Sequence, residues 1–427
     1  MIKSFKKIGE KPFVRNVIIL ASGTAMAQII ALASSPVITR LYGPQAFGLM
    51  GTFTAIVSII GPLAALTYPV AIVIPKRDQD ALSVIRLSLI ITMIISLISM
   101  ITITFFNKQI ANIFNLNEIS AYLFLIPLVI IFAGLMQVAE QWLIRTKQFS
   151  INARVTVLQS IIINGSKIGF GYIYPVATIL IILNTLADGL RAVMMIFFAK
   201  QSNYQKKIEL KTQKRKLKEL AKDYNDFPIY RAPQVFIEKI SQNLPILMLT
   251  AFFGPASAGF YAIGKTVLNQ PHTLISGAVG NVFYPRIVEA FNNKENITLL
   301  IKKTTFALFV VGILPFGIII LFGPFLFSFV FGSDWITAGE YARWIALFSF
   351  SEFINRPSVR TLPVLNAQKF YLNYTIIWLI IRIGLLSIGY FIFSSDYISI
   401  ALFAISSIIS NILLITITLK VSRKKVL

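Results

Sequence analysis

Long runs of apolar residues, separated by short polar clusters, repeat along almost the whole chain. A helix needs about 20 apolar residues to cross the hydrocarbon core of a bilayer. Runs of this length predict twelve membrane-spanning helices. The continuous runs exclude an outer-membrane β-barrel, whose strands alternate apolar and polar residues over about ten positions. The predicted helices lie near residues 14–38, 47–74, 84–106, 119–140, 155–174, 176–199, 229–252, 259–285, 301–322, 338–355, 371–393 and 397–419.

Composition supports the same class. Of the 427 residues, 56% are apolar and only 13% are charged, and the mean hydropathy is +0.75. A soluble domain with so few charged residues could not cover its surface, which excludes a cytosolic enzyme with a minor anchor. The chain has no cysteine, so disulfides, thiolate metal sites and a cysteine nucleophile are excluded. The predicted fold is an all-α polytopic membrane protein.

The distribution of basic residues predicts the topology. If the N-terminus is cytoplasmic, 32 of the 40 Lys and Arg residues lie in cytoplasmic segments, and only Arg40 and Lys108 lie in outer loops. By the positive-inside rule, this ratio predicts that both termini are cytoplasmic and that the number of spans is even. The same rule accounts for most of the net charge of +23, so no nucleic-acid partner is expected.

The sequence contains an internal repeat at a spacing of 211 residues. Thr39–Leu49 and Thr250–Phe260 both read Thr-x-apolar-aromatic-Gly-Pro-x-small-x-Gly-apolar. Each copy falls between the first two helices of a set of six. The repeat predicts two six-helix lobes with the same orientation, related by an axis along the membrane normal. The predicted parts are an N-terminal lobe (1–199), a basic cytoplasmic linker (200–228) and a C-terminal lobe (229–427).

The basic linker carries a weak helical pattern. Leu210, Leu217 and Leu220 fall on one helical face, with lysines around the rest. The pattern suits an amphipathic helix on anionic lipid, and it suits a solvated connector equally well. No segment outside the predicted spans is long enough for a catalytic domain, so we do not expect an enzyme.

Motifs for enzymatic chemistry are weak in this chain. Asp78-Gln79-Asp80 has the spacing of a metal-diphosphate motif, but its loop is too short for a surrounding domain and reads as a solvated turn. His272 is the single histidine, so it cannot form a two-histidine metal site or a recognisable triad. We therefore predict no metal and no cofactor.

Charged residues inside the predicted spans are the more informative signal. Such groups are costly in a bilayer and usually face a wet cavity or a partner. Lys239 and Lys265 lie on the first two helices of the second half, and a positive cavity there implies an anionic cargo. For any one residue, snorkelling or pairing between helices is the competing explanation; Asp188 and Arg191, three residues apart, could neutralise each other. The basic residues are Lys167, Arg191, Lys239, Lys265, Arg343 and Arg382, and the acidic ones are Glu140, Asp188, Glu238 and Glu352.

Motifs around the repeated turns carry a family resemblance. They are the Asn16–Thr39 helix, Arg40-Leu41-Tyr42-Gly43-Pro44, Phe47-Gly48, Gly254-Pro255, Gly259-Phe260-Tyr261-Ala262 and Phe331-Gly332. With these motifs the chain resembles the polysaccharide (O-antigen or capsule) repeat-unit flippases of the MOP exporter superfamily, over nearly its whole length.

The resemblance implies a function. It implies two lobes around a central cavity, lined largely by helices 1, 2, 7 and 8. It also implies that undecaprenyl-diphosphate-linked oligosaccharide moves from the inner to the outer leaflet of a bacterial cytoplasmic membrane by alternating access. A polysaccharide polymerase and a chain-length regulator are the implied protein partners.

The charged residues can be assigned roles on that basis. A diphosphate carries about two negative charges, which Lys and Arg bind through charge-assisted hydrogen bonds. We assign Lys239 and Lys265 to the diphosphate, and Arg40 to an outer gate. Glu238 and Asp188 are candidates for coupling to a cation, and Glu238 is the better one because Arg191 lies within reach of Asp188. The residues expected to supply positive field are Arg191, Lys167 and Arg382.

Two other functions compete with this prediction. A cation-coupled multidrug exporter of the same superfamily would need an acidic cavity, whereas the first two spans contain neither Asp nor Glu. A membrane glycosyltransferase or polymerase would need a large outer loop, whereas the longest one, near Gly323–Thr337, is short and mostly apolar.

Overall fold

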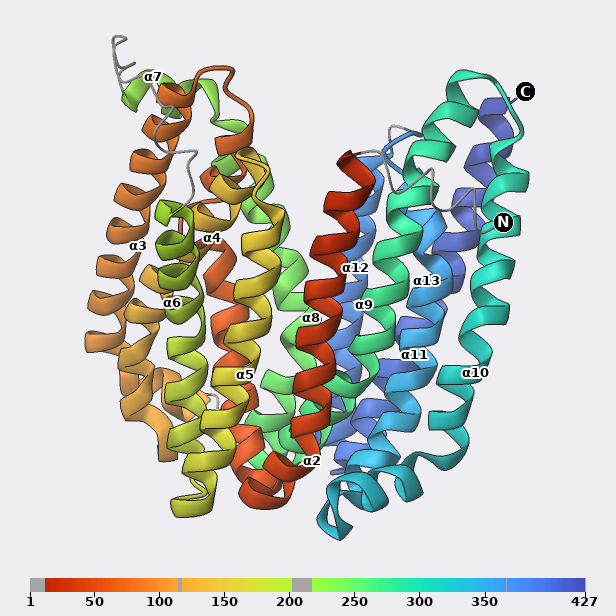
Figure 1. Ribbon diagram of the computed structural model, residues 1–427. Helices are drawn as coiled ribbons and strands as arrows, with labels where there is room; N and C mark the ends of the chain where they lie inside the picture. Colours follow the sequence, from red (N-terminus) through yellow and green to blue (C-terminus); the bar gives the residue numbers. More distant parts are fainter. Residues whose placement is uncertain (1–11, 114–116, 202–216, 366, 427) are drawn as a thin grey trace. The chain divides into compact units, whose positions relative to one another are not determined.

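The computed structural model describes residues 12–113, 117–201, 217–365 and 367–426, and within them the chain forms helices and no strand. Helices α2 to α13 are shown in Figure 1. The first eleven residues and most of the predicted linker, including Leu210, lie outside the described residues, as does the side chain of His272. The long helices are α2 (Pro12–Ile60), α3 (Asp78–Ile113), α4 (Ile126–Arg145), α5 (Phe149–Ile173), α6 (Ala177–Gln201), α8 (Ala232–Phe253), α9 (Pro255–Asn292), α10 (Ile297–Phe331), α11 (Ile336–Thr361), α12 (Gln368–Phe391) and α13 (Asp396–Val426).

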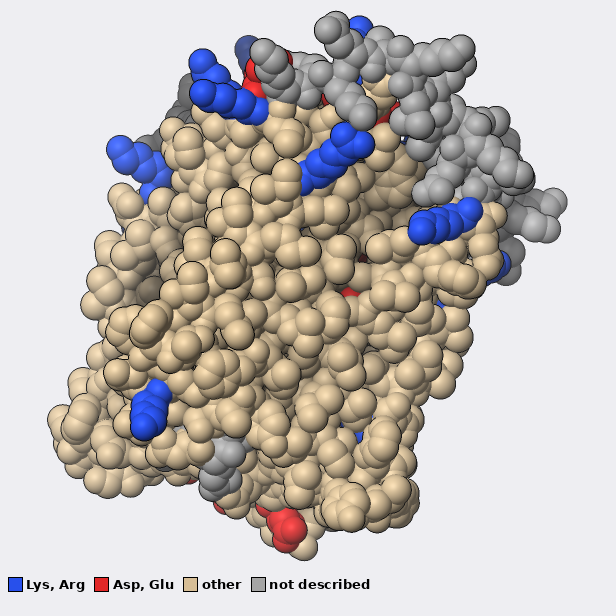
Figure 2. All heavy atoms as spheres, turned by 90° about the vertical axis from the view of Figure 1, so that its left-hand side faces the viewer, with Lys and Arg blue, Asp and Glu red and all other residues tan. Residues whose placement is uncertain are grey.

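The prediction of a polytopic all-α membrane protein is confirmed. Counting α2 as two spans, the described residues hold twelve long helices, and seven stretches are long and apolar enough to cross a membrane by length and composition alone. Phe105, Phe329 and Phe391 each leave more than 70% of their surface exposed, as expected for side chains that face lipid. Figure 2 shows one side of the molecule, with a broad uncharged surface and most of its Lys and Arg towards one end.

The first two spans differ from the prediction. They form one helix, α2, which bends at Gly43, where φ is 68° and ψ is 172°. A positive φ is strained for residues with a side chain, so glycine suits this bend. The predicted second span, 47–74, is wrong at its end: α2 stops at Ile60, and the chain continues through the 3₁₀ helices η1 (Gly61–Leu63) and η2 (Tyr68–Val73). Pro62 and Pro69 lack the backbone N–H that a continued α-helix would need.

The chain forms two compact units. The first comprises Met1–Tyr42 and Leu49–Asn243, and the second comprises Gly43–Gly48 and Leu244–Leu427. The division falls within α8, whereas the sequence analysis placed the second lobe from residue 229. The predicted lobe boundaries stay a prediction.

The linker segment after residue 216 packs on the first unit. Helix α7 (Leu217–Asp223) buries Leu220 completely, in a cluster with Ile72 of η2 and Val84 of α3. The hydroxyl of Tyr68 donates to the carbonyl of Ala221 at 3.1 Å. In the described part of the linker, the apolar side of α7 therefore rests on protein at Leu220.

In the second unit, the two copies of the repeated motif pack against each other. A Cβ atom at Gly48 would overlap the carbonyl oxygen of Pro255, and a Cβ atom at Gly259 would overlap the carbonyl oxygen of Pro44. The contact is reciprocal: the last glycine of each motif lies against the proline of the other. Gly254 is the counterpart of Gly43 in the second copy of the motif. Its φ is also positive, at 88°.

Candidate functional site

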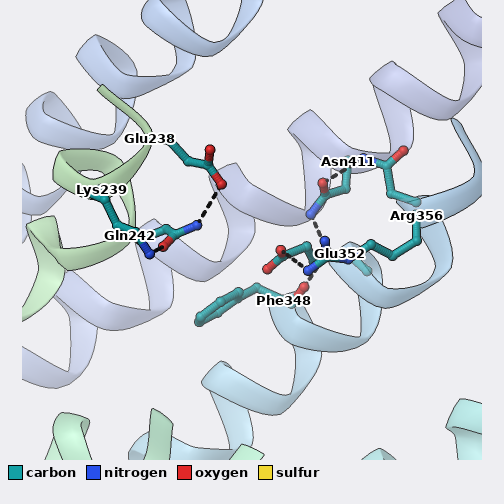
Figure 3. Close-up of polar contacts among 9 residues, drawn as sticks. Glu238, Lys239, Gln242, Phe348, Glu352, Arg356 and Asn411 are labelled. Atoms are coloured by element: carbon teal, nitrogen blue, oxygen red, sulfur yellow. Dashed lines mark hydrogen bonds and ion pairs between the residues drawn. The ribbon is translucent and has the colours of Figure 1, made fainter. Parts of the chain in front are cut away.

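On α8, one amide joins the two charged side chains that the sequence analysis placed on this helix. The Gln242 side chain donates from Nε2 to Oε1 of Glu238 at 3.1 Å. Its Oε1 accepts from Nζ of Lys239 at 3.3 Å. Figure 3 shows the three side chains together. Neighbouring helix positions point in different directions, so Glu238 and Lys239 are linked only because Gln242 lies four and three residues further along.

The polar groups of α8 lie on two different faces. Glu238 and Gln242 are exposed and Lys239 is half-buried. Ser241 and Asn243 are each only 8% exposed, and the Asn243 amide donates to the carbonyl of Lys239 at 2.9 Å. The exposed face therefore carries the acid, the amide and part of the lysine, while the buried face is hydrogen-bonded within the helix.

The two predicted diphosphate ligands belong to different units. Lys239 lies in the first unit, and Lys265 is half-buried on α9 in the second. Each is placed within its own unit, and their joint action on one diphosphate stays a prediction. Arg40 is exposed on α2, three residues before the bend.

Arg191 on α6 forms its ion pair with a residue of another helix rather than with Asp188 on its own helix. Its guanidinium lies 3.6 Å from Oε1 of Glu140 on α4 and donates to Oδ1 of Asn152 on α5 at 3.1 Å. The Asn152 amide in turn contacts the same Glu140 oxygen at 3.5 Å. Asp188 lies close enough to interact electrostatically with both Arg191 and Glu140. Arg191 therefore joins three helices, and Glu140 offsets much of the positive field expected from it.

Lys167 lies in the outer part of α5 by the predicted topology. Its backbone carbonyl accepts a hydrogen bond from the Tyr42 hydroxyl at 2.8 Å, and the Tyr42 ring packs directly on Gly171. The Lys167 side chain is half-buried, and its amine has no hydrogen-bond partner among the described residues.

The second unit contains a polar cluster around Arg382 on α12. The guanidinium donates to the hydroxyl of Ser410 on α13 at 3.0 Å and lies over the ring of Phe403, 5.7 Å from its centre. Arg382 and Glu352 both interact electrostatically with the buried phenol of Tyr261 on α9. These contacts place the Arg382 guanidinium within a polar network inside the second unit.

Next to this network, α11 and α13 are joined by amides. Nδ2 of Asn355 donates to Oδ1 of Asn411 at 2.9 Å, and Nδ2 of Asn411 donates to the Ser351 hydroxyl at 2.9 Å. Arg356 and Glu352 form an ion pair at 3.1 Å along α11 (Figure 3). These amides were not among the predicted site residues; the signal that could have revealed them is the spacing of Ser351 and Asn355, one turn apart on α11.

The repeat also relates charged residues of the two units. Arg145 and Arg356 are separated by 211 residues, and Glu140 and Glu352 by 212. Arg145 donates to Asp78 at 2.8 and 3.0 Å and to the carbonyls of Ile72 and Pro75 at 3.0 and 2.7 Å. Each unit thus has an acid and an arginine near the end of its fourth long span, held by different partners.

The described residues contain no group of three or more His, Asp or Glu side chains that could hold a metal ion. The polar chemistry of the described spans therefore consists of lysine and arginine cations, a few carboxylates, amides and hydroxyls. Such a set can bind anions and hydroxyl groups.

Comparison with known protein families identifies the family of the chain. A family model described as polysaccharide biosynthesis protein matches residues 37–340. No curated protein matches the sequence.

Several solved structures share the fold. A lipid II flippase, MurJ, in an inward closed conformation has a TM-score of 0.71 and 16% identity, over 96% of this chain and 90% of its own. An inward-facing multidrug resistance MATE family transporter of the MOP superfamily has a TM-score of 0.70 and 16% identity, over 95% of this chain and 99% of its own. A MOP superfamily transporter from Pyrococcus furiosus, with a binding pocket of reversed polarity, has a TM-score of 0.63 and 14% identity, over 96% and 95%. The chain therefore has the fold of MOP superfamily transporters.

Proposed function

The chain belongs to the polysaccharide biosynthesis protein family, and on that premise we propose that it is a flippase for lipid-linked glycans. It moves undecaprenyl-diphosphate-linked oligosaccharide repeat units from the cytoplasmic to the outer leaflet of a bacterial inner membrane, by alternating access. The observation that carries the proposal is the hydrogen-bonded Glu238–Gln242–Lys239 group on α8, a helix of the membrane-spanning set.

This group indicates a water-filled space rather than lipid. Charged side chains in contact with lipid cost several kcal/mol each, so those in spanning helices face cavities or partners. Lys239 keeps a positive charge beside that space, and Lys265 on α9 supplies a second one in the other unit. Two ammonium groups suit a diphosphate, whose oxygens accept charge-assisted hydrogen bonds, while the prenyl tail remains in the bilayer.

The fold is compatible with such a cargo, because one of the similar structures is a lipid II flippase. It is equally compatible with a multidrug transporter, so the charge of the spans discriminates between the two. The first two spans contain no Asp or Glu, which favours an anionic cargo over cationic drugs. Arg40, Arg382 and Lys167 add positive charge to the proposed path, with Arg40 at the outer gate.

The membrane potential can drive the transport. An inside-negative potential contributes about 2.3 kcal/mol per charge per 100 mV to the outward movement of an anion. If a cation is also exchanged, Glu238 is the better carrier, since it is exposed and hydrogen-bonded to a neutral amide. Asp188 lies close to the ion pair that Arg191 forms with Glu140 inside the first unit.

Complementation of a gene deletion tests the cargo. Lys239→Ala and Lys265→Ala are each expected to reduce surface glycan at normal protein levels, and the corresponding Lys→Arg variants are expected to retain more. Lys303→Ala is the matched control, because Lys303 is exposed and lies in a predicted cytoplasmic segment. If both alanine variants complement as well as the control, the lysines do not bind the diphosphate.

Partners and topology follow from the same proposal. A polymerase and a chain-length regulator would act on the flipped repeat unit at the outer face. Both termini and the linker would face the cytoplasm, where the lipid-linked glycan is made.

A further inference from the structure

One exposed face of α8 carries a continuous line of polar side chains. Tyr230, Gln234, Glu238 and Gln242 follow each other at intervals of four residues, and all four are exposed. We call these four residues the α8 stripe. Positions four apart lie above one another on a helix, and at 1.5 Å per residue the stripe extends for about 18 Å. A single ligand group would not need so long a surface.

The stripe begins in a pocket. Its first residue, Tyr230, lies in η5 (Phe227–Arg231), a π-helical turn that precedes α8. The pocket has a volume of about 260 Å³, slightly below the range of about 300–1,000 Å³ for small-molecule sites. This volume suits one ring-sized group rather than a whole repeat unit. The pocket is lined by Asp226, Phe227, Tyr230, Arg231 and Gln234.

The stripe lies outside the buried positions of this part of α8. Between residues 232 and 243, the buried residues are Ala232, Ser241 and Asn243, and none of them belongs to the stripe. Within the stripe, the side chains of Gln242 and Glu238 share a hydrogen bond. Amides and a carboxylate facing lipid would be costly, so the stripe faces water or a polar ligand.

The chemistry of the stripe differs from that of the lysines. Two amides offer both donors and acceptors, a carboxylate offers acceptors, and a phenol offers one of each. Sugar hydroxyl groups need this mixture of donors and acceptors, whereas phosphate needs only donors. The exposed ring of Tyr230 in the pocket presents an apolar face, on which the C–H face of a sugar ring can lie.

From these observations we propose that the α8 stripe is a binding track for the glycan of the cargo, and that the pocket at Phe227 and Tyr230 receives one of its sugar rings. The inference rests on the proposed function and refines it: the lysines bind the diphosphate, and the stripe binds the oligosaccharide. The track then makes recognition depend on the length of the glycan.

Transport of two lipids by the reconstituted full-length protein tests the proposal. One lipid is the undecaprenyl-diphosphate-linked repeat unit that accumulates in cells lacking this gene, and the other is the same lipid trimmed enzymatically to its first sugar. Gln234→Met removes the amide of the stripe that does not contact Lys239, and it keeps a side chain that favours helix formation. We expect this variant to flip the complete repeat unit about tenfold more slowly, equivalent to about 1.4 kcal/mol, and the trimmed lipid at the wild-type rate.

Controls separate the possible results. Gln368→Met, at an exposed position of α12, should leave both rates unchanged. Tyr230→Ala should slow the complete unit more than Tyr230→Phe, which keeps the ring; this pair supplies a second test if Gln234→Met is unstable. Equal slowing of both lipids, or no slowing of either, would overturn the track. If the wild-type protein flips neither lipid, the proposed function itself is wrong.

Discussion

Gly259 packs against the carbonyl oxygen of Pro44 so closely that a methyl group on residue 259 would overlap it. The repeated motif supplies both sides of this contact. A backbone oxygen cannot move aside as a flexible side chain can, so the glycine is required by packing rather than by its own dihedral angles.

Gly259→Ala is therefore expected to destabilise the protein by about 3 kcal/mol, at the upper end of the cost of overpacking. Gly384→Ala on α12 is the matched control, because a Cβ atom there would meet nothing within 4 Å. Thermal unfolding of both purified variants in detergent measures the difference. Equal melting temperatures would show that the motif contact does not contribute to stability.

Arg145 holds the end of α4 to the turn before α3. Its side chain is 10% exposed and its partner Asp78 is 37% exposed. Arg145→Leu is expected to lower the free energy of unfolding by about 2–3 kcal/mol, because hydrogen bonds to charged groups are lost. Asp78→Asn should cost less, since the arginine keeps the carbonyls of Ile72 and Pro75. Chemical denaturation of the two variants gives the order, and the reverse order would contradict this account.

Glu140 and Asp188 offer a comparison between two carboxylates near the same guanidinium. Glu140→Gln is expected to destabilise the first unit more than Asp188→Asn, because Glu140 contacts both Arg191 and Asn152. Removing one partner of a partly buried pair leaves an uncompensated charge. Protein yield and melting temperature provide the measurement. A larger loss for Asp188→Asn would mean that Arg191 pairs along its own helix.

The pair between Arg286 and Glu295 makes a prediction about pH. The hydrogen bond from Arg286 lowers the pKa of Glu295 below its ordinary value of 4.5. A carboxylate with a lowered pKa stabilises the folded state above its unfolded pKa, and this contribution is lost as pH falls through the folded pKa. The stability advantage of the wild type over Glu295→Gln should therefore be constant from pH 7 to about pH 5 and shrink below 4.5. An advantage independent of pH down to pH 3 would contradict it.

Reporter fusions test the predicted topology. A fusion at Asp226, next to η5, is expected to show cytoplasmic activity, and one at Asp396, at the start of α13, is expected to show activity on the outer side. The reason is the concentration of basic residues in alternate loops. Outer activity at Asp226, or cytoplasmic activity at Asp396, would refute the predicted orientation.

The class of the protein, nearly all of its helices and the repeated motif could be predicted from the pattern of residues along the chain. Hydropathy over about 20 residues is a local property, because any spanning segment must satisfy its backbone hydrogen bonds internally and present apolar side chains to lipid. Turns at Gly43 and Gly254 could also be predicted, since Gly-Pro pairs mark turns. The early end of α2 at Ile60 was missed, because the residues that follow it remain apolar.

The tertiary structure alone decided which polar groups meet. Arg191 pairs with Glu140 of α4, although Asp188 on its own helix was the nearer choice in sequence. Leu220 is buried against η2 and α3, and the two motif copies contact each other across 211 residues. Such contacts depend on how helices are rotated and packed, which no local pattern of the chain contains. Helical spacing alone would have allowed the Gln242 amide to be predicted near Glu238 and Lys239. Whether it bonds to both depends on the side-chain rotamers in the folded helix.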